Sequence, residues 1–454
     1  GTLVRVEAKV SIDGGAYAST TAAVLANACY FAVGPYRCDS VSVDGVGVRT
    51  NNPPCGAMRG FGAVQVCFAY ETQMDRLAAE LDIDPLELRR RNALGRGDAM
   101  PTTGQIIDTP LPTLEVIDSL EAMPLLDVSG SEDDPLRLPG GTGLTTESRH
   151  VKRAVGYALG LKNLGFSEGF DDFAQARVIL GPDGAIVETA AIEVGQGLVS
   201  VLAQIARTEL GVSRAEVRHV DTSRIDSAGS TSASRQTQIS GGATYEAAAK
   251  LRERILEWAG GDRLDDQGVW RGDELLAPMS EVTAEEWEET VTFRHPPTSP
   301  PDEDGQGVVQ ADFAVAGHRA LVEVDTELGL VKVHRVDTSQ DVGKALNPES
   351  VRGQIEGGIL QGVGLAVMEE LVVDRGVIRN PNFTDYLLPT ILDAPDVEAL
   401  LIEEEGSWGP YGAKGVGEPP TISSTAAVAA AIRNATGRPI NRVPVRPQDI
   451  VIGD

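Results

Sequence analysis

The chain has 454 residues, of which 42% are hydrophobic, and this composition supports a large buried core divided into two or more domains. Its net charge of −28 argues against a protein that binds nucleic acid or anionic membranes, and indicates a solubility surface or a salt-tolerant host. No apolar run reaches the ~18 residues that a membrane-spanning helix requires.

Cysteine and histidine are too dispersed to form a metal site by themselves. The cysteines include no C-x-x-C pair, which argues against a zinc or iron–sulfur site on this chain. Nothing indicates secretion, so we expect reduced thiols in a cytoplasmic protein. No two histidines have the spacing of metal ligands, and each is interpreted as a structural histidine or a surface histidine. These residues are Cys29, Cys38, Cys55, Cys67, His150, His219, His295, His318 and His334.

The first predicted domain covers residues 1–121. Its opening stretch, GTLVRVEAKVSIDGGA, alternates like a strand from residue 1, so we expect the chain to begin inside a fold. Residues 1–48 predict strands separated by a helix of small residues, TTAAVLANACYFA. Residues 62–95 predict helical structure, in which DIDP supplies an aspartate cap and a proline in the first turn.

Residues 122–150 are rich in Gly, Pro, Ser and Asp and predict a linker to a second domain, 151–454. Within that domain the acidic, proline-rich segment 260–308 predicts a variable surface insert. Strands and helices mix without a regular βαβ repeat, which favours an α+β fold of two mixed domains. The patterns predict hairpins over 175–193 and 318–343, and helices over 197–210, 241–258, 349–371 and 421–437.

Four segments share one design, in which small flexible residues lead into a helix. Helix N-termini present free N–H groups and bind anions such as phosphate. Glutamine both donates and accepts, which suits the edge of a flat heterocycle. For any one segment alone, tight helix packing is a better explanation than cofactor binding. Taken together, the four segments predict a large anionic cofactor. The segments are CGAMRGFGAVQ (55–65), EVGQGLVS (193–200), GSTSASRQTQISGGA (229–243) and VRGQIEGGILQGVG (351–364).

A fifth segment, YGAKGVGEPP (411–420), holds one acid, Glu418, between glycines and a proline pair. Glycine lets a backbone approach another group closely, and proline stiffens the residues after it. Two interpretations stay open: a general base beside the cofactor, or a cap on the helix predicted at 421–437. A nicotinamide site at GQGLVS is rejected, because the strand before it belongs to a hairpin and not to a βαβ unit.

These segments and DVGKALNP (341–348) resemble, in order and spacing, the molybdenum-cofactor-binding large (D) subunit of the xanthine dehydrogenase (molybdenum hydroxylase) family. The resemblance covers nearly the whole chain. It implies hydroxylation of a purine such as hypoxanthine or xanthine, with oxygen taken from water. It also implies a molybdopterin, in the cytosine dinucleotide form, through which the molybdenum is held without a protein ligand. Electrons would pass to partner subunits that carry [2Fe–2S] clusters and FAD.

The resemblance also assigns roles to individual residues. Glu418 would be the catalytic base, and Phe61 and Phe166 would enclose a flat substrate. Gln196, the 233–237 loop and Gln361 are expected to converge on one cleft between the two domains, with Arg59 at its rim. The implied cofactor contacts are Arg59, Gly60, Phe61, Gly195, Gln196, Gly197, Ala233, Ser234, Arg235, Gln236, Thr237, Gln361 and Lys414.

The sequence departs from the family in two ways. The family's large subunit begins well before residue 1, so part of the pocket is expected to lie outside this chain, and the fragment alone to carry no molybdenum. The arginine that orients purines in animal members has no counterpart, and spacing places its position near Asn27. Two alternatives therefore stay open: an oxidoreductase for aldehydes or nicotinate-type heterocycles, and a fragment that is inactive alone.

Overall fold

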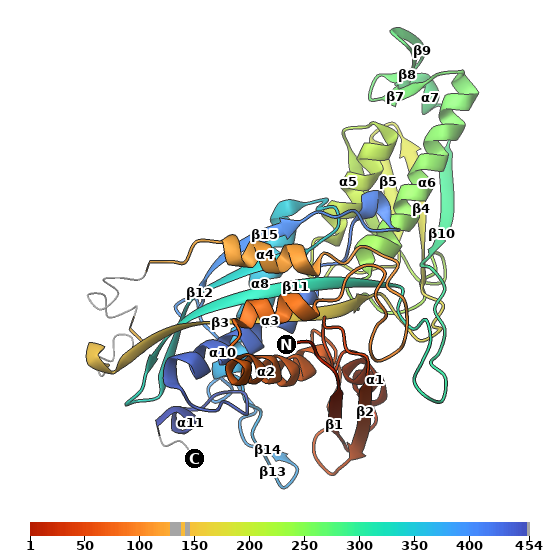
Figure 1. Cartoon of the computed structure of the whole chain (residues 1–454). Helices are drawn as coiled ribbons and strands as arrows, with labels where there is room; N and C mark the ends of the chain where they lie inside the picture. Colours follow the sequence, from red (N-terminus) through yellow and green to blue (C-terminus); the bar gives the residue numbers. More distant parts are fainter. Residues whose placement is uncertain (128–137, 141–145, 452–454) are drawn as a thin grey trace.

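The computed structural model describes residues 1–127, 138–140 and 146–451. Helices combine with two four-stranded sheets and smaller sheets, so the predicted mixed α+β fold class is confirmed (Figure 1). Of the predicted linker, residues 128–137 and 141–145 lie outside the described part. Among the helices of the described residues, none is long and apolar enough to cross a membrane.

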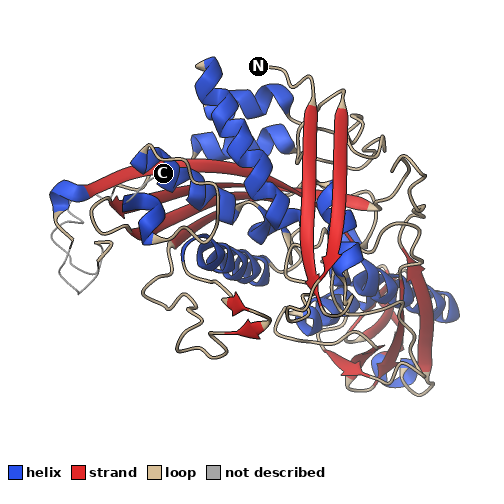
Figure 2. Ribbon diagram, turned by 90° about the horizontal axis from the view of Figure 1, so that it is seen from below, coloured by secondary structure: helices blue, strands red, loops and turns tan. Residues whose placement is uncertain are grey.

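The first ninety residues form the elements that their patterns predict. Strands β1 and β2 pair in parallel and stand apart from the larger sheets (Figure 2). Asp84 caps helix α3, because its carboxylate accepts hydrogen bonds from the N–H groups of Leu86 and Glu87. Helix α4 was not predicted. The elements are β1 (Val6–Gly15), α1 (Thr21–Tyr30), β2 (Val41–Arg49), α2 (Ala63–Leu81), α3 (Pro85–Asn92) and α4 (Thr113–Ala122).

A long sheet in the order β15-β12-β11-β3 forms the centre of the molecule (Figure 1). Its antiparallel β11–β12 pair confirms the predicted hairpin at 318–343. Helices cover both faces: Gly156 of β3 lies against α10, and Gly317 of β11 lies against α4. The elements are β3 (Val151–Leu164), β11 (Asp312–Asp325), β12 (Leu330–Asp341), β15 (Asp396–Ile402), α8 (Pro348–Val367), α9 (Pro419–Ile422), α10 (Ser424–Thr436) and α11 (Pro447–Val451).

A second sheet, in the order β10-β4-β5-β6, carries α5 and α6. Its β4–β5 pair is the hairpin predicted at 175–193. The segment predicted as an insert is partly built into this sheet, since β10 pairs with β4 along its length. The elements are β4 (Phe173–Gly181), β5 (Gly184–Thr189), α5 (Leu198–Leu210), β6 (Ala215–His219), α6 (Gln236–Ala259), β7 (Arg263–Asp265), β8 (Gly268–Arg271), β9 (Glu274–Pro278), α7 (Met279–Val282) and β10 (Trp287–Arg294).

One hydrophobic core joins the two predicted domains. It contains Cys67 of α2, Leu159 of β3 and Val428 of α10, which are all fully buried. Removing this much apolar surface from water strongly favours the packed arrangement. The shared core therefore fixes the segment 55–65 relative to the segment 411–420, although they lie at opposite ends of the chain. The sheet that contains β4 has a separate core of its own.

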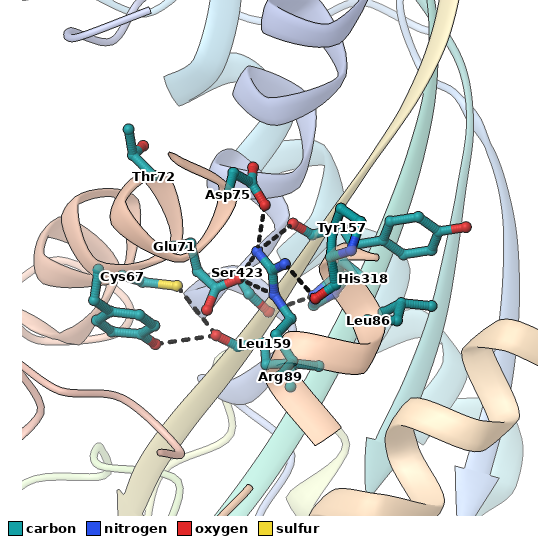
Figure 3. Close-up of polar contacts among 12 residues, drawn as sticks. Cys67, Glu71, Thr72, Asp75, Leu86, Arg89, Tyr157, Leu159, His318 and Ser423 are labelled. Carbon is teal, nitrogen blue, oxygen red and sulfur yellow. Dashed lines mark hydrogen bonds and ion pairs between the residues drawn. The ribbon is translucent and has the colours of Figure 1, made fainter. Parts of the chain in front are cut away.

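A buried arginine ties α3 to its neighbours (Figure 3). Arg89 is 0% exposed, and its guanidinium lies 2.7 Å from the Glu71 carboxylate and 2.8 Å from that of Asp75, both on α2. It also donates a hydrogen bond to the Tyr157 carbonyl of β3. A buried charge is tolerated when it is paired and hydrogen-bonded in this way. The network holds α2, and the loop that precedes it, against the central sheet.

We expect the stability of the fold to fall in acid because of His318 on β11. Its Nδ1 lies 2.7 Å from the Ser423 hydroxyl (Figure 3), and burial lowers the pKa of His318 to about 3. In an unfolded chain a histidine pKa is about 6.5, so the stability that neutral His318 supplies is complete above that pH and is lost as the pH falls toward 3. We expect the free energy of unfolding to fall by up to about 1.4 kcal/mol per pH unit below about pH 6.5.

The measurement is urea unfolding at about pH 7, 6 and 5. His318→Gln keeps a polar partner for Ser423 but does not titrate, so its stability should fall less steeply with acid. Equal slopes for the two proteins would contradict the assignment to His318.

Candidate functional site

A cavity of about 920 Å³ opens where loops from distant parts of the chain meet. Three of the four glycine-rich segments contribute to it through several residues each, and so does the 411–420 segment. From the fourth glycine-rich segment, only Gln354 lines the wall. The predicted residues on the wall are Arg59, Phe61, Phe166, Gly195, Gln196, Ala233, Ser234, Arg235, Gln236, Thr237 and Glu418.

The loops around the cavity adopt backbone conformations that non-glycine residues rarely take. Phe61 has φ of 49°, Ala233 of 56° and Ser234 of 50°. Such left-handed conformations cost energy and persist where the surrounding structure enforces them, which is common at functional sites. The positive φ of Gly195, 101°, is one that glycine adopts freely. Two of the segments predicted to contact a cofactor, 55–65 and 229–243, therefore contain strained backbone at the cavity.

Glu418 is held at the cavity by groups from two other segments. One carboxylate oxygen accepts from the Gly60 N–H at 3.1 Å, and the other accepts from the Ser234 hydroxyl at 3.1 Å. The Glu418 N–H in turn donates to the Ser234 oxygen at 2.9 Å. Although Glu418 directly precedes α9, its side chain makes no capping hydrogen bond. The capping interpretation is therefore wrong, and the carboxylate is oriented toward the cavity segments instead.

Arg59 lies within the wall and joins three segments. Its Nε donates to the Gly417 carbonyl, and its Nη2 donates to the Gln354 carbonyl at 2.9 Å. Burial lowers the pKa of Arg59, and the Glu418 carboxylate opposes that change. The side chain thus fixes the 411–420 segment to α8, in addition to presenting a cation to the cavity.

Arg235 provides a buried cation with unused donors. It is 0% exposed, lies 2.9 Å from the Asp172 carboxylate and stacks its guanidinium over the Phe166 ring at 4.8 Å. Among the described residues, its Nε and Nη1 have no hydrogen-bond partner, and neither does Nε2 of Gln236. Burial lowers the pKa of Arg235 and raises that of Asp172, and each charge opposes the change in the other. Buried orphan donors of this kind suit a bound anion.

The Gln196 amide is engaged within its own loop, accepting from Val194 N–H and donating to the Ile192 carbonyl. Glu193, which sequence reasoning did not single out, accepts from the N–H groups of Gly195, Gly197 and Val199 at the start of α5. This acid at the start of a helix is the signal that could have identified it. Together these bonds fix the shape of the 193–200 segment.

Two predicted cofactor residues lie away from the cavity. Lys414 is buried in an ion pair with Asp341 at 2.7 Å and donates to the Pro110 carbonyl, so its ammonium points elsewhere. Gln361 lies farther along α8 than Gln354 and does not line the wall. Gly60 and Gly197 are not wall residues either, but each is next to one along the chain.

The glycines of α8 have a packing role. An added Cβ at Gly362 would lie 1.9 Å from the Ser424 hydroxyl, and one at Gly358 would lie 2.7 Å from Pro420. These glycines let α8 approach the segment that comes after Glu418. Tight helix packing is therefore the better explanation of the 351–364 segment.

Several polar wall residues were missed by sequence reasoning or were given no role, and they include Asn27, Lys162, Asn163 and Glu168. Burial raises the pKa of Glu168 and lowers that of Lys162. The available signal was the polar pair Lys162-Asn163 inside the apolar run VGYALGLKNLG. For Asn27, the only earlier indication was the spacing that places the family's purine-orienting arginine near this residue.

Two stretches of the chain match family descriptions that both read molybdopterin cofactor-binding domain, over residues 1–93 and 142–395. The chain belongs to the molybdopterin cofactor-binding domain family, and the resemblance seen in its motifs is confirmed. A probable xanthine dehydrogenase subunit of Bacillus subtilis is 32% identical to it, over 99% of this chain and 60% of that relative.

Solved structures of related enzymes share the fold. Quinoline 2-oxidoreductase from Pseudomonas putida matches with a TM-score of 0.82 and 29% identity, over 98% of this chain and 59% of its own. Aldehyde oxidoreductase from Desulfovibrio desulfuricans matches with a TM-score of 0.81 and 27% identity, over 99% of this chain and 47% of its own. The chain thus spans about half of these larger proteins.

Proposed function

We propose that this chain forms the cofactor-binding part of a molybdenum hydroxylase in which Glu418 is the general base. The observation that carries the proposal is the position of the Glu418 carboxylate. It lies at the cavity wall, fixed by the Gly60 N–H and the Ser234 hydroxyl, and it caps no helix. A general base must be held within hydrogen-bond reach of the proton it removes, and two donors from separate segments provide that orientation.

The residues of the cavity fit a molybdopterin. The orphan donors of Arg235 and Gln236 suit a phosphate group of such a cofactor, and the resemblance of the motifs supports its cytosine dinucleotide form. The cofactor could come close to the protein backbone at Gly195, which has no side chain, and at the 233–237 loop. When bound, the cofactor would supply the metal that activates an oxygen derived from water and takes up two electrons from the substrate.

The chain itself would bind and orient the substrate and move one proton. Phe61 and Phe166 line the cavity and offer flat apolar surfaces to a heterocycle. Glu418 would accept the proton of the attacking oxygen at one of its carboxylate oxygens. General-base catalysis of this kind contributes about 10²–10⁴-fold to a rate.

We infer that the substrate is a purine such as hypoxanthine or xanthine. The similarity to a probable xanthine dehydrogenase subunit over nearly the whole chain supports this choice. The alternative is another N-heterocycle or an aldehyde, because the related solved structures are named for quinoline and aldehyde. The electrons would pass to partner subunits with [2Fe–2S] clusters and FAD. The four free cysteines suit the cytoplasm.

The test uses the complete enzyme that contains this chain, purified with its partner subunits. Molybdenum and released cytidine nucleotide are measured first. Hypoxanthine, nicotinate and an aromatic aldehyde are then offered in water labelled with heavy oxygen. We expect stoichiometric molybdenum and a labelled product from hypoxanthine. An enzyme without molybdenum, or a product oxygen that comes from dioxygen, would refute the proposal.

A further inference from the structure

Tyr411 begins the segment that carries Glu418 and has no part in the function proposed above. Its backbone lies in the left-handed region, with φ of 55°, between Gly409 at 89° and Gly412 at 73°. Glycine adopts such angles freely, whereas a tyrosine in this region is strained. Strain of this kind persists only where the surrounding structure enforces it. The contacts of the Tyr411 side chain therefore call for an explanation.

Two helices of the second sheet hold the Tyr411 side chain. Its hydroxyl donates to the Glu209 carboxylate of α5 at 2.5 Å, and its ring packs edge-on against Tyr245 of α6, with the ring centroids 5.2 Å apart. Glu209 is 7% exposed, and Arg252 of α6 lies 3.6 Å from its carboxylate. Burial and the hydrogen bond to Glu209 both raise the pKa of Tyr411, so the hydroxyl keeps its proton and stays the donor. Hydrogen bonds to a charged acceptor are among the stronger ones.

The same two helices lead away from the cavity. Helix α5 begins within the predicted cofactor segment 193–200, and α6 begins within the predicted cofactor segment 229–243. The helices lie side by side on the second sheet, around its separate core (Figure 1). Glu418 instead directly precedes α9, where Ile422 belongs to the central core. The base and two cofactor segments are thus attached to different cores.

The contacts of Glu418 cross the boundary between these two parts. Its carboxylate accepts from the Ser234 hydroxyl, just before α6, and from the Gly60 N–H, just before α2 in the central core. Parts of a chain with separate cores depend on the contacts between them for their relative position. Tyr411 supplies such a contact at the opposite end of the 411–420 segment from Glu418.

We propose that Tyr411 and Glu209 are positioning residues, whose hydrogen bond fixes the segment that carries Glu418 relative to the segments 193–200 and 229–243. Neither residue is a wall residue of the cavity, so both act through the backbone that leads to Glu418. The inference rests on the proposed function, because it takes Glu418 as the base. Without the bond the carboxylate would shift relative to the cofactor, whereas the two segments stay attached to their own helices. A misplacement of about 1 Å can cost up to about 100-fold in rate.

The test measures kcat and KM in the complete molybdenum-loaded enzyme. The substrate is hypoxanthine, or nicotinate or an aromatic aldehyde where the wild type oxidises that compound instead. Tyr411→Phe keeps the ring and removes the hydroxyl. It should lower kcat about 10-fold. The KM should stay within about threefold and the molybdenum content should equal that of the wild type, because the hydroxyl binds neither substrate nor cofactor.

Variants of Glu209 separate the hydrogen bond from other effects. Glu209→Gln keeps an acceptor for the hydroxyl, so kcat should stay within about threefold of the wild type. Glu209→Ala removes the acceptor and should lower kcat as much as Tyr411→Phe does. Combining Glu209→Ala with Tyr411→Phe should cost no more than either change alone, because both remove the same bond.

Tyr386→Phe is the matched control. It removes a tyrosine hydroxyl that donates to the Glu369 carboxylate at 2.8 Å away from the cavity wall, and it should leave kcat normal. The positioning role would be overturned by a normal kcat in Tyr411→Phe, by additive losses in the double variant, or by an equal loss in Tyr386→Phe. A loss of molybdenum in step with turnover would also overturn it. A wild-type enzyme that lacks molybdenum, or oxidises none of the three compounds, would refute the proposed function instead.

Discussion

Glu418→Gln should lower turnover by at least about 100-fold while molybdenum content and melting temperature stay near those of the wild type. The lower limit is that of general-base catalysis. The structure explains why the fold should tolerate the change. A glutamine carbonyl can accept from Gly60 N–H, and its amide can donate to the Ser234 oxygen, so both contacts of the carboxylate have a replacement. What is lost is the ability to take up a proton, together with the negative charge that faces the Lys162 ammonium at 3.7 Å.

Glu418→Asp separates the catalytic role from a structural one. Shortening the side chain by one methylene withdraws the carboxylate from both donors and from the reacting oxygen, so turnover should also fall steeply. Asp84→Ala is the control, since Asp84 does cap a helix. It should cost about 1 kcal/mol of stability and leave turnover unchanged. Near-normal turnover in a molybdenum-loaded Glu418→Gln enzyme would end the assignment of Glu418 as the base.

The parts of this site that sequence could predict are those set by local geometry. The prolines after Glu418 restrict the backbone by themselves, and Gly437, the last residue of the stretch predicted as a helix at 421–437, follows α10 in the left-handed conformation that glycine adopts easily. The hairpins result from strand alternation and turn residues. Such features depend on residues that are near one another along the chain.

The features that sequence could not predict depend on distant pairing. Lys162 lies in an apolar run that predicts a buried strand, and only the pairing of β3 with β11 and the packing of α9 bring it to Glu418. Lys414 lies two residues from the wall residue Val416, but its ammonium is paired with Asp341 of β12. No local pattern indicates in which direction either lysine points.

The second large effect is expected at Gly415, three residues before Glu418. An added Cβ there would lie 1.6 Å from the Ser234 carbonyl oxygen and 2.6 Å from its carbon. Both atoms belong to the backbone, so no side-chain rotation relieves the contact. Ser234 is already held at φ of 50°, and its hydroxyl binds Glu418. Gly415→Ala must therefore push apart the two segments that position the base.

We expect Gly415→Ala to lose at least about 100-fold in turnover, as the base variant does, although Glu418 itself is intact. It should also lose molybdenum, because the 233–237 loop moves with Ser234, whereas circular dichroism should show the helices retained. Gly353→Ala is the matched control. Gly353 lies in α8, and no atom of the described residues lies within 4 Å of an added Cβ, so this change should leave turnover normal and raise stability by up to about 1 kcal/mol. Normal turnover and metal content in Gly415→Ala would show that the contact between these two segments does not position the base.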